Sequence, residues 1–258
     1  MTVPESPGRR ARIGAAFAAA HDYDRHARVQ ARIAQGLARR IAALPLPPGP
    51  GLLEIGCGTG HLTAALAETG LGGDWLITDL APAMVDRARA RLGESPARRF
   101  APLDGEHGPT PAEAPFDLVC SSLAFQWFED PASAARRLMD WVRPGGWLAI
   151  ATLSERTFHE WRTAHAALGR EPGTVPLPPP DRFAALFPGA RVITETETER
   201  HQTARDFLHA LKAIGAATPA PGHRPLTPGE LRRVMREFEA AGAQATYQVA
   251  TVLWQKAG

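Results

Sequence analysis

Cysteine, lysine and long apolar runs are all scarce in this chain of 258 residues. The two cysteines, Cys57 and Cys120, lie in apolar contexts without metal-ligand spacing, which predicts a reducing compartment, no disulfide and no metal site. No apolar run reaches the roughly 18–20 residues that a membrane span requires, and the first residues lack the pattern of a signal peptide. We therefore expect a cytoplasmic protein with no membrane partner.

Positive charge comes almost entirely from arginine, because lysine occurs only at positions 212 and 256. The formal net charge of +2 gives no basis for nucleic-acid binding. Residues 8–40 nevertheless hold many arginines against only two acids, Asp22 and Asp24. This excess is typical either of a solvated helix surface or of a face turned toward an acidic partner, and the sequence leaves both open.

The nine histidines are scattered, and no set of Ser, His and Asp or of Cys and His is spaced for nucleophilic catalysis. We interpret His21, His26 and His61 as structural or peripheral.

The middle of the chain alternates short apolar runs with stretches of helical periodicity. The expected strands are 52–55, 75–78, 99–102, 116–121 and 147–152, and the expected helices are 62–69, 82–92 and 131–142. Such alternation predicts an α/β fold whose parallel sheet is covered on both faces by helices.

Segments on either side of this core have different patterns. Residues 1–10 are expected to be a flexible N-terminus, and residues 11–44 form a helical leader with a break near 21–24. Downstream, 191–199 reads as an edge strand and 245–255 as a final strand, with helices at 204–214 and 228–241. The proline-rich segment 172–180 is expected to be a loop that contributes to a lid. We predict a single domain over 11–258, in which the leader and residues 154–258 cover a cofactor-binding core at 51–153.

A glycine-rich turn follows the first predicted strand. Gly56, Gly58 and Gly60 let the backbone approach a ligand closely, and the helix that follows presents free N–H groups. The spacing Gly-x-Gly-x-Gly differs from the Gly-x-Gly-x-x-Gly of NAD enzymes. Together with Glu54, this turn resembles the first motif of the Rossmann-like class I S-adenosylmethionine-dependent methyltransferases. The resemblance implies S-adenosyl-L-methionine as cofactor, S-adenosyl-L-homocysteine as product, and a mostly parallel seven-stranded sheet.

Acidic and hydroxyl side chains follow the predicted strands at positions suited to this cofactor. Asp79 ends the second strand, where a carboxylate can accept both ribose hydroxyls or else cap the next helix. Asp104 follows the third strand, where such enzymes contact the adenine amino group, although a solvated turn is the alternative. Ser121 and Ser122 end the fourth strand and can offer hydroxyls near the amino-acid end of the cofactor. Glu54 favours the methionine ammonium group or bonds amides of the glycine turn. The expected cofactor residues are Tyr23, Gln30, Glu54, Gly56, Cys57, Gly58, Gly60, Asp79, Leu80, Met84, Asp104, Gly105 and Ser121.

Four further segments narrow the resemblance. The leader reads Phe17-x5-Tyr23-Asp24-x2-Ala27-x2-Gln30, and the others are Leu80-Ala81-Pro82-Ala83-Met84, Leu123-Ala124-Phe125-Gln126-Trp127 and Leu211-Lys212-x-Ile214-Gly215-Ala216. Over about residues 12–255 the chain is similar to the malonyl-acyl carrier protein O-methyltransferases of biotin synthesis. It departs from their pattern after the third strand, at 103–109, and after the fifth, at 153–158.

This resemblance implies methyl transfer from the sulfonium to the free carboxylate of a malonyl group on acyl carrier protein, or on coenzyme A. A carboxylate is already ionised at neutral pH, so no general base is required. Tyr23, Gln126 and Trp127 are expected to orient the reactants, and Tyr23, Trp127 and Lys212 to bind the acceptor. The alternatives are core aromatics for Tyr23 and Trp127 and a solvated lysine for Lys212.

Partners and rival functions follow from the same reading. The chain is expected to be a monomer. Because acyl carrier proteins are acidic, a basic face should lie beside the pocket mouth, and its candidates are Arg9, Arg10, Arg12, Arg25, Arg28, Lys212, Arg232, Arg233 and Arg236. There are two rival functions. One is methylation of another small carboxylic or carbon acid, and the other is a role as a cofactor-binding assembly factor with the same fold.

Overall fold

The computed structural model describes residues 8–19, 23–214, 216, 219–220 and 222–258. Most of the predicted flexible N-terminus, the centre of the predicted break in the leader and Gly215 therefore lie outside the described residues. The leader forms α1 (Arg9–Ala18), α2 (Tyr23–His26) and α3 (Arg28–Ala42).

Seven strands form one sheet in the order β3-β2-β1-β4-β5-β7-β6. Strands β1 to β5 pair in parallel, and β7 runs antiparallel to both of its neighbours, β5 and β6. The predicted mostly parallel, seven-stranded sheet is confirmed, including β6 at its edge. The strand bounds are β1 Leu52–Ile55, β2 Trp75–Asp79, β3 Arg98–Pro102, β4 Phe116–Ser122, β5 Val142–Leu153, β6 Arg191–Arg200 and β7 Gln244–Gln255.

Helices cover both faces of the sheet, as the continuous apolar strands require. Neighbouring strand residues divide between the faces: Leu52 packs in the cluster with α3, α4 (His61–Glu68) and α5 (Pro82–Leu92), whereas Leu53 packs in the cluster with α6 (Pro131–Asp140) and α8 (Pro180–Leu186). Both leucines are fully buried. The predicted two-sided covering is therefore confirmed.

Helix starts follow local rules that the sequence displays. Pro82 and Pro131 occupy the first turn of α5 and α6, where the missing N–H has no helical partner to lose. Thr203 and Thr227 each form a capping box that begins α9 (Ala204–Ala213) and α10 (Pro228–Ala240). These two helices agree with the predicted ranges to within one residue.

The region after β5 differs from the expectation. It contains two helices that the sequence pattern did not indicate, α7 (His159–Ala166) and α8, and a short 3-10 helix, η1 (Phe125–Trp127), follows β4. Strand β5 also begins at Val142, five residues earlier than expected, because Val142 pairs with Phe116 across a register shift. Both helices are only seven or eight residues long, too short for a clear periodic signal.

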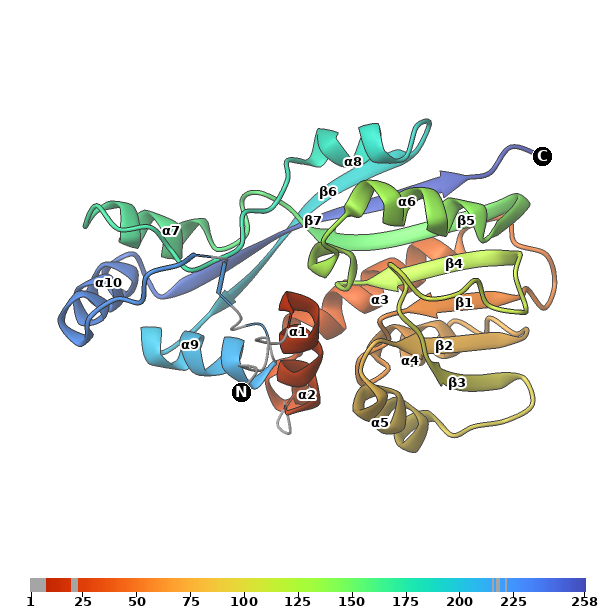
Figure 1. The fold of residues 1–258 in the computed structure, drawn as a ribbon, viewed down its shortest axis with the longest axis horizontal. Helices are drawn as coiled ribbons and strands as arrows, with labels where there is room; N and C mark the ends of the chain where they lie inside the picture. The colour runs from red at the N-terminus through yellow and green to blue at the C-terminus, as the bar shows by residue number, and fades with distance from the viewer. Residues whose placement is uncertain (1–7, 20–22, 215, 217–218, 221) are drawn as a thin grey trace, which may run out of the picture.

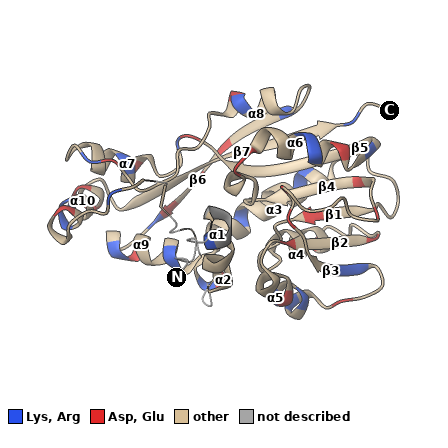
Figure 2. Cartoon of the chain, viewed as in Figure 1, with Lys and Arg blue, Asp and Glu red and all other residues tan. Residues whose placement is uncertain are grey.

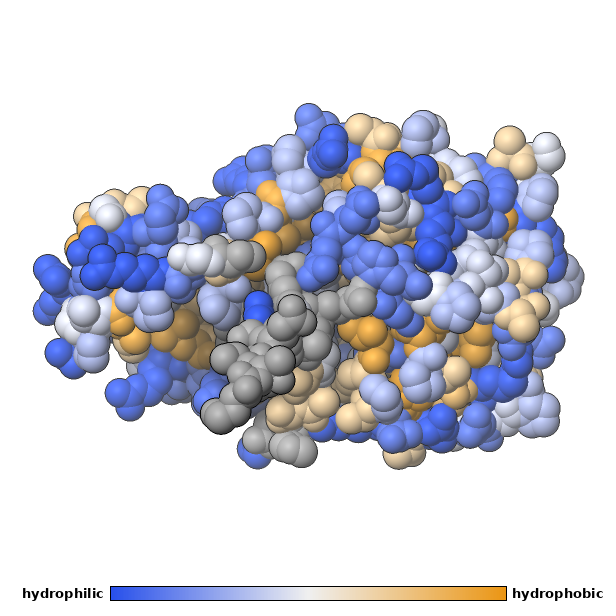
Figure 3. All heavy atoms as spheres, viewed as in Figure 1, coloured by the Kyte–Doolittle hydropathy of each residue, from blue (hydrophilic) through white to orange (hydrophobic). Residues whose placement is uncertain are grey.

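Figure 1 shows how the helices of the leader and of the C-terminal part are placed relative to the parallel strands. The long β6–β7 ribbon extends beyond the parallel strands to a group formed by α7, α9 and α10, and α1 and α2 lie between this group and the parallel strands. The face in Figure 3 is mostly hydrophilic, with apolar atoms in separate patches. In the part of the chain that the structure describes, every helix is too short or too polar to cross a membrane.

Candidate functional site

The glycine turn between β1 and α4 has the backbone that its sequence requires. Gly56, Gly58 and Gly60 all have positive φ, at 71°, 55° and 86°. A Cβ on Gly56 would lie 2.3 Å from the Cβ of Ala124, so the two segments touch at this point. Gly60 differs in role: it begins α4 and faces Leu92 of α5, outside the cavity that the turn lines.

A cavity of about 990 Å³, including its open mouth, lies above the carboxyl ends of the parallel strands. Its walls come from the glycine turn, from the segments after β2, β3 and β4, and from the leader. Among the predicted cofactor residues, the structure brings to it Tyr23, Gln30, Glu54, Gly56, Cys57, Gly58, Asp79, Leu80, Met84, Asp104 and Gly105.

Asp79 is held by the backbone on two sides. Its Oδ2 accepts from the Gly58 N–H at 2.9 Å, and its Oδ1 accepts from the Ala81 N–H at 2.8 Å, just before α5. Burial raises the pKa of Asp79, and these backbone hydrogen bonds counteract the shift. The carboxylate therefore fixes the glycine turn and lines the cavity, whereas α5 has no side-chain cap, so Asp79 does not cap this helix.

Glu54 lies at the floor of the cavity with 1% of its surface exposed. Thr63 donates to its Oε2 at 2.5 Å. Burial raises the pKa of Glu54 to about 7. The hydrogen bond from Thr63 opposes this rise, and the charge of Asp79 adds to it. A carboxylate so far removed from water gains from a cationic ligand group placed beside it.

The segment after β3 forms a tight turn around Asp104. Its Oδ1 accepts from the N–H groups of Glu106 and His107, at 3.0 and 3.1 Å. A Cβ on Gly105 would lie 2.5 Å from the Ile55 side chain, so glycine is required for the close approach of this turn to β1. Asp104 and Gly105 thus have structural roles as well as a place in the cavity wall.

Ser121 is not brought to the cavity, contrary to the prediction. It is buried, and its hydroxyl donates to the Ile55 carbonyl at 2.9 Å. Ser122, which the sequence also offered as a hydroxyl near the cofactor, does line the cavity. Successive side chains of β4 point to opposite faces, so only one of these two adjacent serines reaches the cavity.

The leader closes one side of the cavity through contacts with three elements. Asp24 accepts from the Thr59 hydroxyl at 2.6 Å and lies 3.2 Å from Nε2 of His61. Phe17 packs edge-on against Trp127, with ring centroids 5.6 Å apart. Tyr23 stacks on His61 and is held in an apolar, acidic setting that raises its pKa, mainly through burial. His61, interpreted from the sequence as peripheral, thus belongs to the cavity wall.

A second cavity adjoins the first. The two share Phe17, Tyr23, Gln30, Leu123 and Trp127. The other walls of the second cavity come from α7, α9, β7 and the loop before α8. Two adjoining chambers that share wall residues suit a reaction between two bound molecules.

The remaining predicted acceptor residues differ in position. Gln126 lines the second cavity, but its amide is engaged: Nε2 donates to the Leu123 carbonyl at 2.8 Å, and Oε1 accepts from the Thr152 hydroxyl at 3.1 Å. Lys212 is exposed on α9 and lines neither cavity. The inward residues of α9 are Phe207 and Leu211, and Lys212 lies about 100° around the helix from Leu211.

A charged residue of the second cavity was not predicted from the sequence. Arg162 of α7 lines this chamber, in a helix that was not predicted. Its neighbours Trp161 and His165 have the i, i+4 spacing of a buried helix face, which was the available signal. Among the described residues, no group of three or more His, Cys, Asp or Glu side chains is arranged to hold a metal ion.

Comparison with known proteins shows which family and which fold this chain shares. A family model described as a methyltransferase domain matches residues 53–148. The solved structure of YcgJ from Bacillus subtilis aligns with a TM-score of 0.60 over 87% of this chain and 98% of that one, at 15% identity, which shows the shared fold alone.

Sequence relatives are closer. The chain is 49% identical over 240 residues to the biotin biosynthesis bifunctional protein BioCD of Bordetella avium, covering 93% of this chain and 51% of that protein, so it spans about half the length of that relative. It is 37% identical over 247 residues to the malonyl-acyl-carrier protein O-methyltransferase of Magnetococcus marinus, covering 93% and 91% of the two chains. The chain therefore belongs to the malonyl-acyl-carrier protein O-methyltransferase family of S-adenosylmethionine-dependent methyltransferases.

Proposed function

We propose that this enzyme transfers the methyl group of S-adenosylmethionine to the free carboxylate of a malonyl group carried by acyl carrier protein. The observation that carries the proposal is the pair of adjoining chambers, with Tyr23, Gln30 and Trp127 in their common wall. One chamber has the carboxylates and glycine backbone suited to the cofactor. The other is mainly apolar and suits an acyl thioester. The relatives named for this reaction support the same assignment.

The reaction requires the protein mainly to position the two reactants. A carboxylate oxygen attacks the sulfonium methyl, the C–S bond breaks toward sulfur, and no proton moves. In this proposal Tyr23 and Trp127, which line both chambers, align the carboxylate with the methyl group, and the leader shields both from water. In the cofactor chamber, Asp79 is assigned to the ribose and Glu54 to the ammonium group.

Methyl transfer from labelled cofactor, followed by mass analysis of the acceptor, tests this proposal directly. Malonyl-acyl carrier protein is expected to gain one methyl group as an ester, with S-adenosylhomocysteine formed in equal amount. Methylation of other small carboxylic acids but not of malonyl thioesters would replace the acceptor assignment. Cofactor binding without methylation of any of them would favour an assembly role.

Cofactor affinity is expected to depend on pH through Glu54. Its pKa is raised to about 7, so the carboxylate form is lost as the pH falls below 7. An ammonium group binds the carboxylate form, so the dissociation constant should rise roughly tenfold between pH 7.5 and pH 6. Calorimetric titration of the wild type at these two pH values measures the change.

Glu54→Gln is the matched control, because it keeps an acceptor for the Thr63 hydroxyl and removes the titrating group. Its affinity should be weaker than that of the wild type at pH 7.5 and nearly constant over the same range. A wild type whose affinity does not change with pH would show that Glu54 does not face the ammonium group.

Basic residues near the chambers are the candidates for docking the acidic carrier. Figure 2 shows Lys and Arg on α2 and on α9. Arg25 and Arg28 are exposed on the leader, as is Lys212 on α9. Part of the arginine excess has another explanation, because Arg32 and Arg40 pair with acids of β6, at 2.8 and 2.6 Å.

Reversing Arg25 and Arg28 to glutamate is expected to raise the Michaelis constant for malonyl-acyl carrier protein about tenfold or more. Exposed charges act mainly on encounter and are screened beyond about 10 Å at 0.1 M salt, so added salt should weaken the wild type similarly. The control reverses Arg182 and Arg191, which are exposed on α8 and at the start of β6. Malonyl-coenzyme A should be little affected in either variant; an equal effect on both substrates would show that the leader arginines shape the pocket and do not dock the carrier.

A further inference from the structure

The second chamber combines apolar walls with a single permanent charge. Trp161, Leu208, Leu211 and Tyr247 are among its lining residues. None of the described residues that line it is acidic, and Arg162 is the only Lys or Arg among them. A cation in such a chamber is stabilised less by solvent than it is at an open surface.

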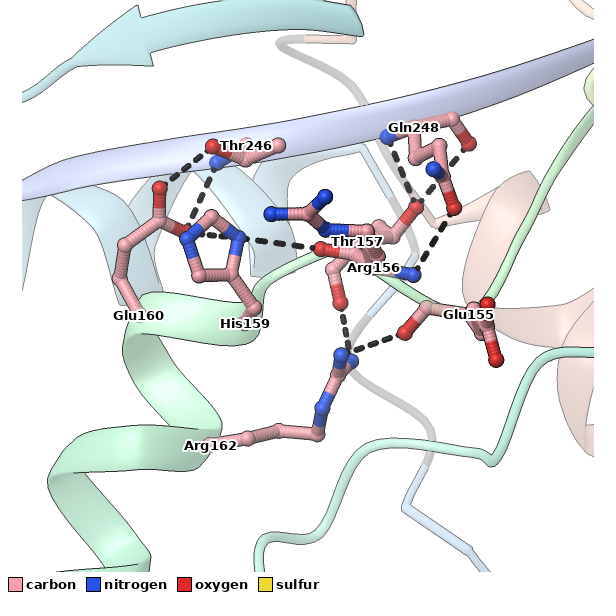
Figure 4. Close-up of polar contacts among 8 residues, drawn as sticks. All are labelled: Glu155, Arg156, Thr157, His159, Glu160, Arg162, Thr246 and Gln248. Carbon is pink, nitrogen blue, oxygen red and sulfur yellow. Dashed lines mark hydrogen bonds and ion pairs between the residues drawn. The ribbon is translucent and has the colours of Figure 1, made fainter. Parts of the chain in front are cut away.

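Backbone carbonyls hold Arg162 in place. Its Nη1 donates to the Thr157 carbonyl and its Nη2 to the Glu155 carbonyl, as Figure 4 shows. Both carbonyls belong to the segment between β5 and α7, so the guanidinium is fixed relative to the end of the sheet. These neutral partners orient the group without cancelling its charge.

No carboxylate of the described residues lies within ion-pair distance of Arg162. Glu160, two residues away, is turned to β7, where it accepts from the Thr246 N–H at 3.1 Å and from the Thr246 hydroxyl. Burial lowers the pKa of Arg162, and the charges of Glu160 and Glu155 oppose that shift from a longer range. The guanidinium therefore stays charged, oriented and without a close counter-ion.

We propose that Arg162 binds the carboxylate of the acceptor and so selects acyl groups that end in a negative charge. The inference rests on the proposed function, because it names the residue that recognises its substrate. One carboxylate oxygen faces Arg162 while the other faces the wall shared with the cofactor chamber. Methyl transfer joins the carboxylate to a sulfonium methyl, giving a neutral ester and a neutral thioether. The product loses its attraction to Arg162, which favours its release.

Arg162→Gln tests the assignment with two thioesters of N-acetylcysteamine that differ only in charge and lack any phosphate. The malonyl thioester carries the carboxylate, and the acetoacetyl thioester replaces it with a neutral acetyl group of similar shape. In the wild type, malonyl should bind more tightly than acetoacetyl. Loss of a charge-assisted contact should weaken malonyl binding about 10- to 100-fold while acetoacetyl binding stays within about twofold.

Arg156→Gln is the matched control. Arg156 lies in the same segment, is exposed and lines neither chamber, yet the variant loses the same charge. It should leave both thioesters unaffected. Arg162→Lys keeps the charge and should recover part of the malonyl preference. Cofactor affinity of all three variants should match the wild type, and all three should stay folded, which thermal unfolding checks.

Three outcomes would overturn the assignment. Equal weakening of both thioesters in Arg162→Gln would make Arg162 a structural support of the chamber. An unchanged malonyl affinity would place the carboxylate elsewhere. An effect seen only with coenzyme A esters would assign Arg162 to the phosphate of the carrier arm. Binding is measured by calorimetry with S-adenosylhomocysteine present, so these results stand apart from methyl transfer by the wild type, whose absence would contradict the proposed function instead.

Discussion

Gly56→Ala is expected to weaken S-adenosylmethionine binding by about 100-fold or more, and with it methyl transfer. The added Cβ would meet the Cβ of Ala124 at 2.3 Å, a distance that non-bonded carbons do not adopt. Either the glycine turn or the segment that leads into η1 must move. Both line the cofactor cavity, so a shift of either displaces groups that contact the cofactor. Calorimetric titration with the cofactor measures the loss.

Gly70→Ala separates this steric effect from the general cost of a positive φ. Gly70 has a φ of 78°, close to the 71° of Gly56, but no atom lies within 4 Å of its added Cβ. This control should lose about 1–2 kcal/mol of stability and keep its cofactor affinity. If both variants bind the cofactor equally well, close contact between Gly56 and Ala124 has no part in shaping the site.

The fold was predictable where residues close together in the sequence determine the local structure. A run such as Leu52–Ile55 is buried on both faces, and prolines and capping threonines mark helix starts within one turn. In the segment between β5 and β6, Pro180 begins α8, but the start of α7 lacks these signals. Helix α7 has no side-chain cap, because the residue before it is Phe158. Phe158 has a φ of 56°, and its ring packs against Phe207 and Tyr247.

The site was predictable for residues tied to the glycine motif and less so for those placed by distant contacts. Asp79 follows from its place at the end of β2. Carbonyls of the preceding turn hold the side chain of Arg162, which lines its chamber, and no spacing in the sequence shows this relation. Lys212 illustrates the opposite case: it stands in a segment resembling the family, yet the helix turns it to solvent.

Removing residues 1–26 is expected to lower the turnover number at least about 100-fold while the sheet and α3 stay folded. The truncation removes Phe17, Tyr23 and Asp24, which contribute to the common wall of the two chambers or anchor the leader to the glycine turn. It ends before α3, whose Val29 and Ile33 belong to the main core. Methyl transfer then loses alignment and shielding from water, whereas most of the cofactor contacts assigned to the strand ends remain.

Two control variants test whether the truncation acts through loss of the leader. A chain lacking only residues 1–7 keeps all of α1 and should retain full activity. Tyr23→Phe removes one hydroxyl from an otherwise intact leader, so it should reduce turnover while leaving cofactor affinity within about threefold. If the longer truncation is folded and binds cofactor but still turns over at the wild-type rate, the leader is not a lid. If it loses cofactor binding and turnover by the same factor, the leader acts as part of the cofactor site, and alignment of the acceptor must come from η1 and α7.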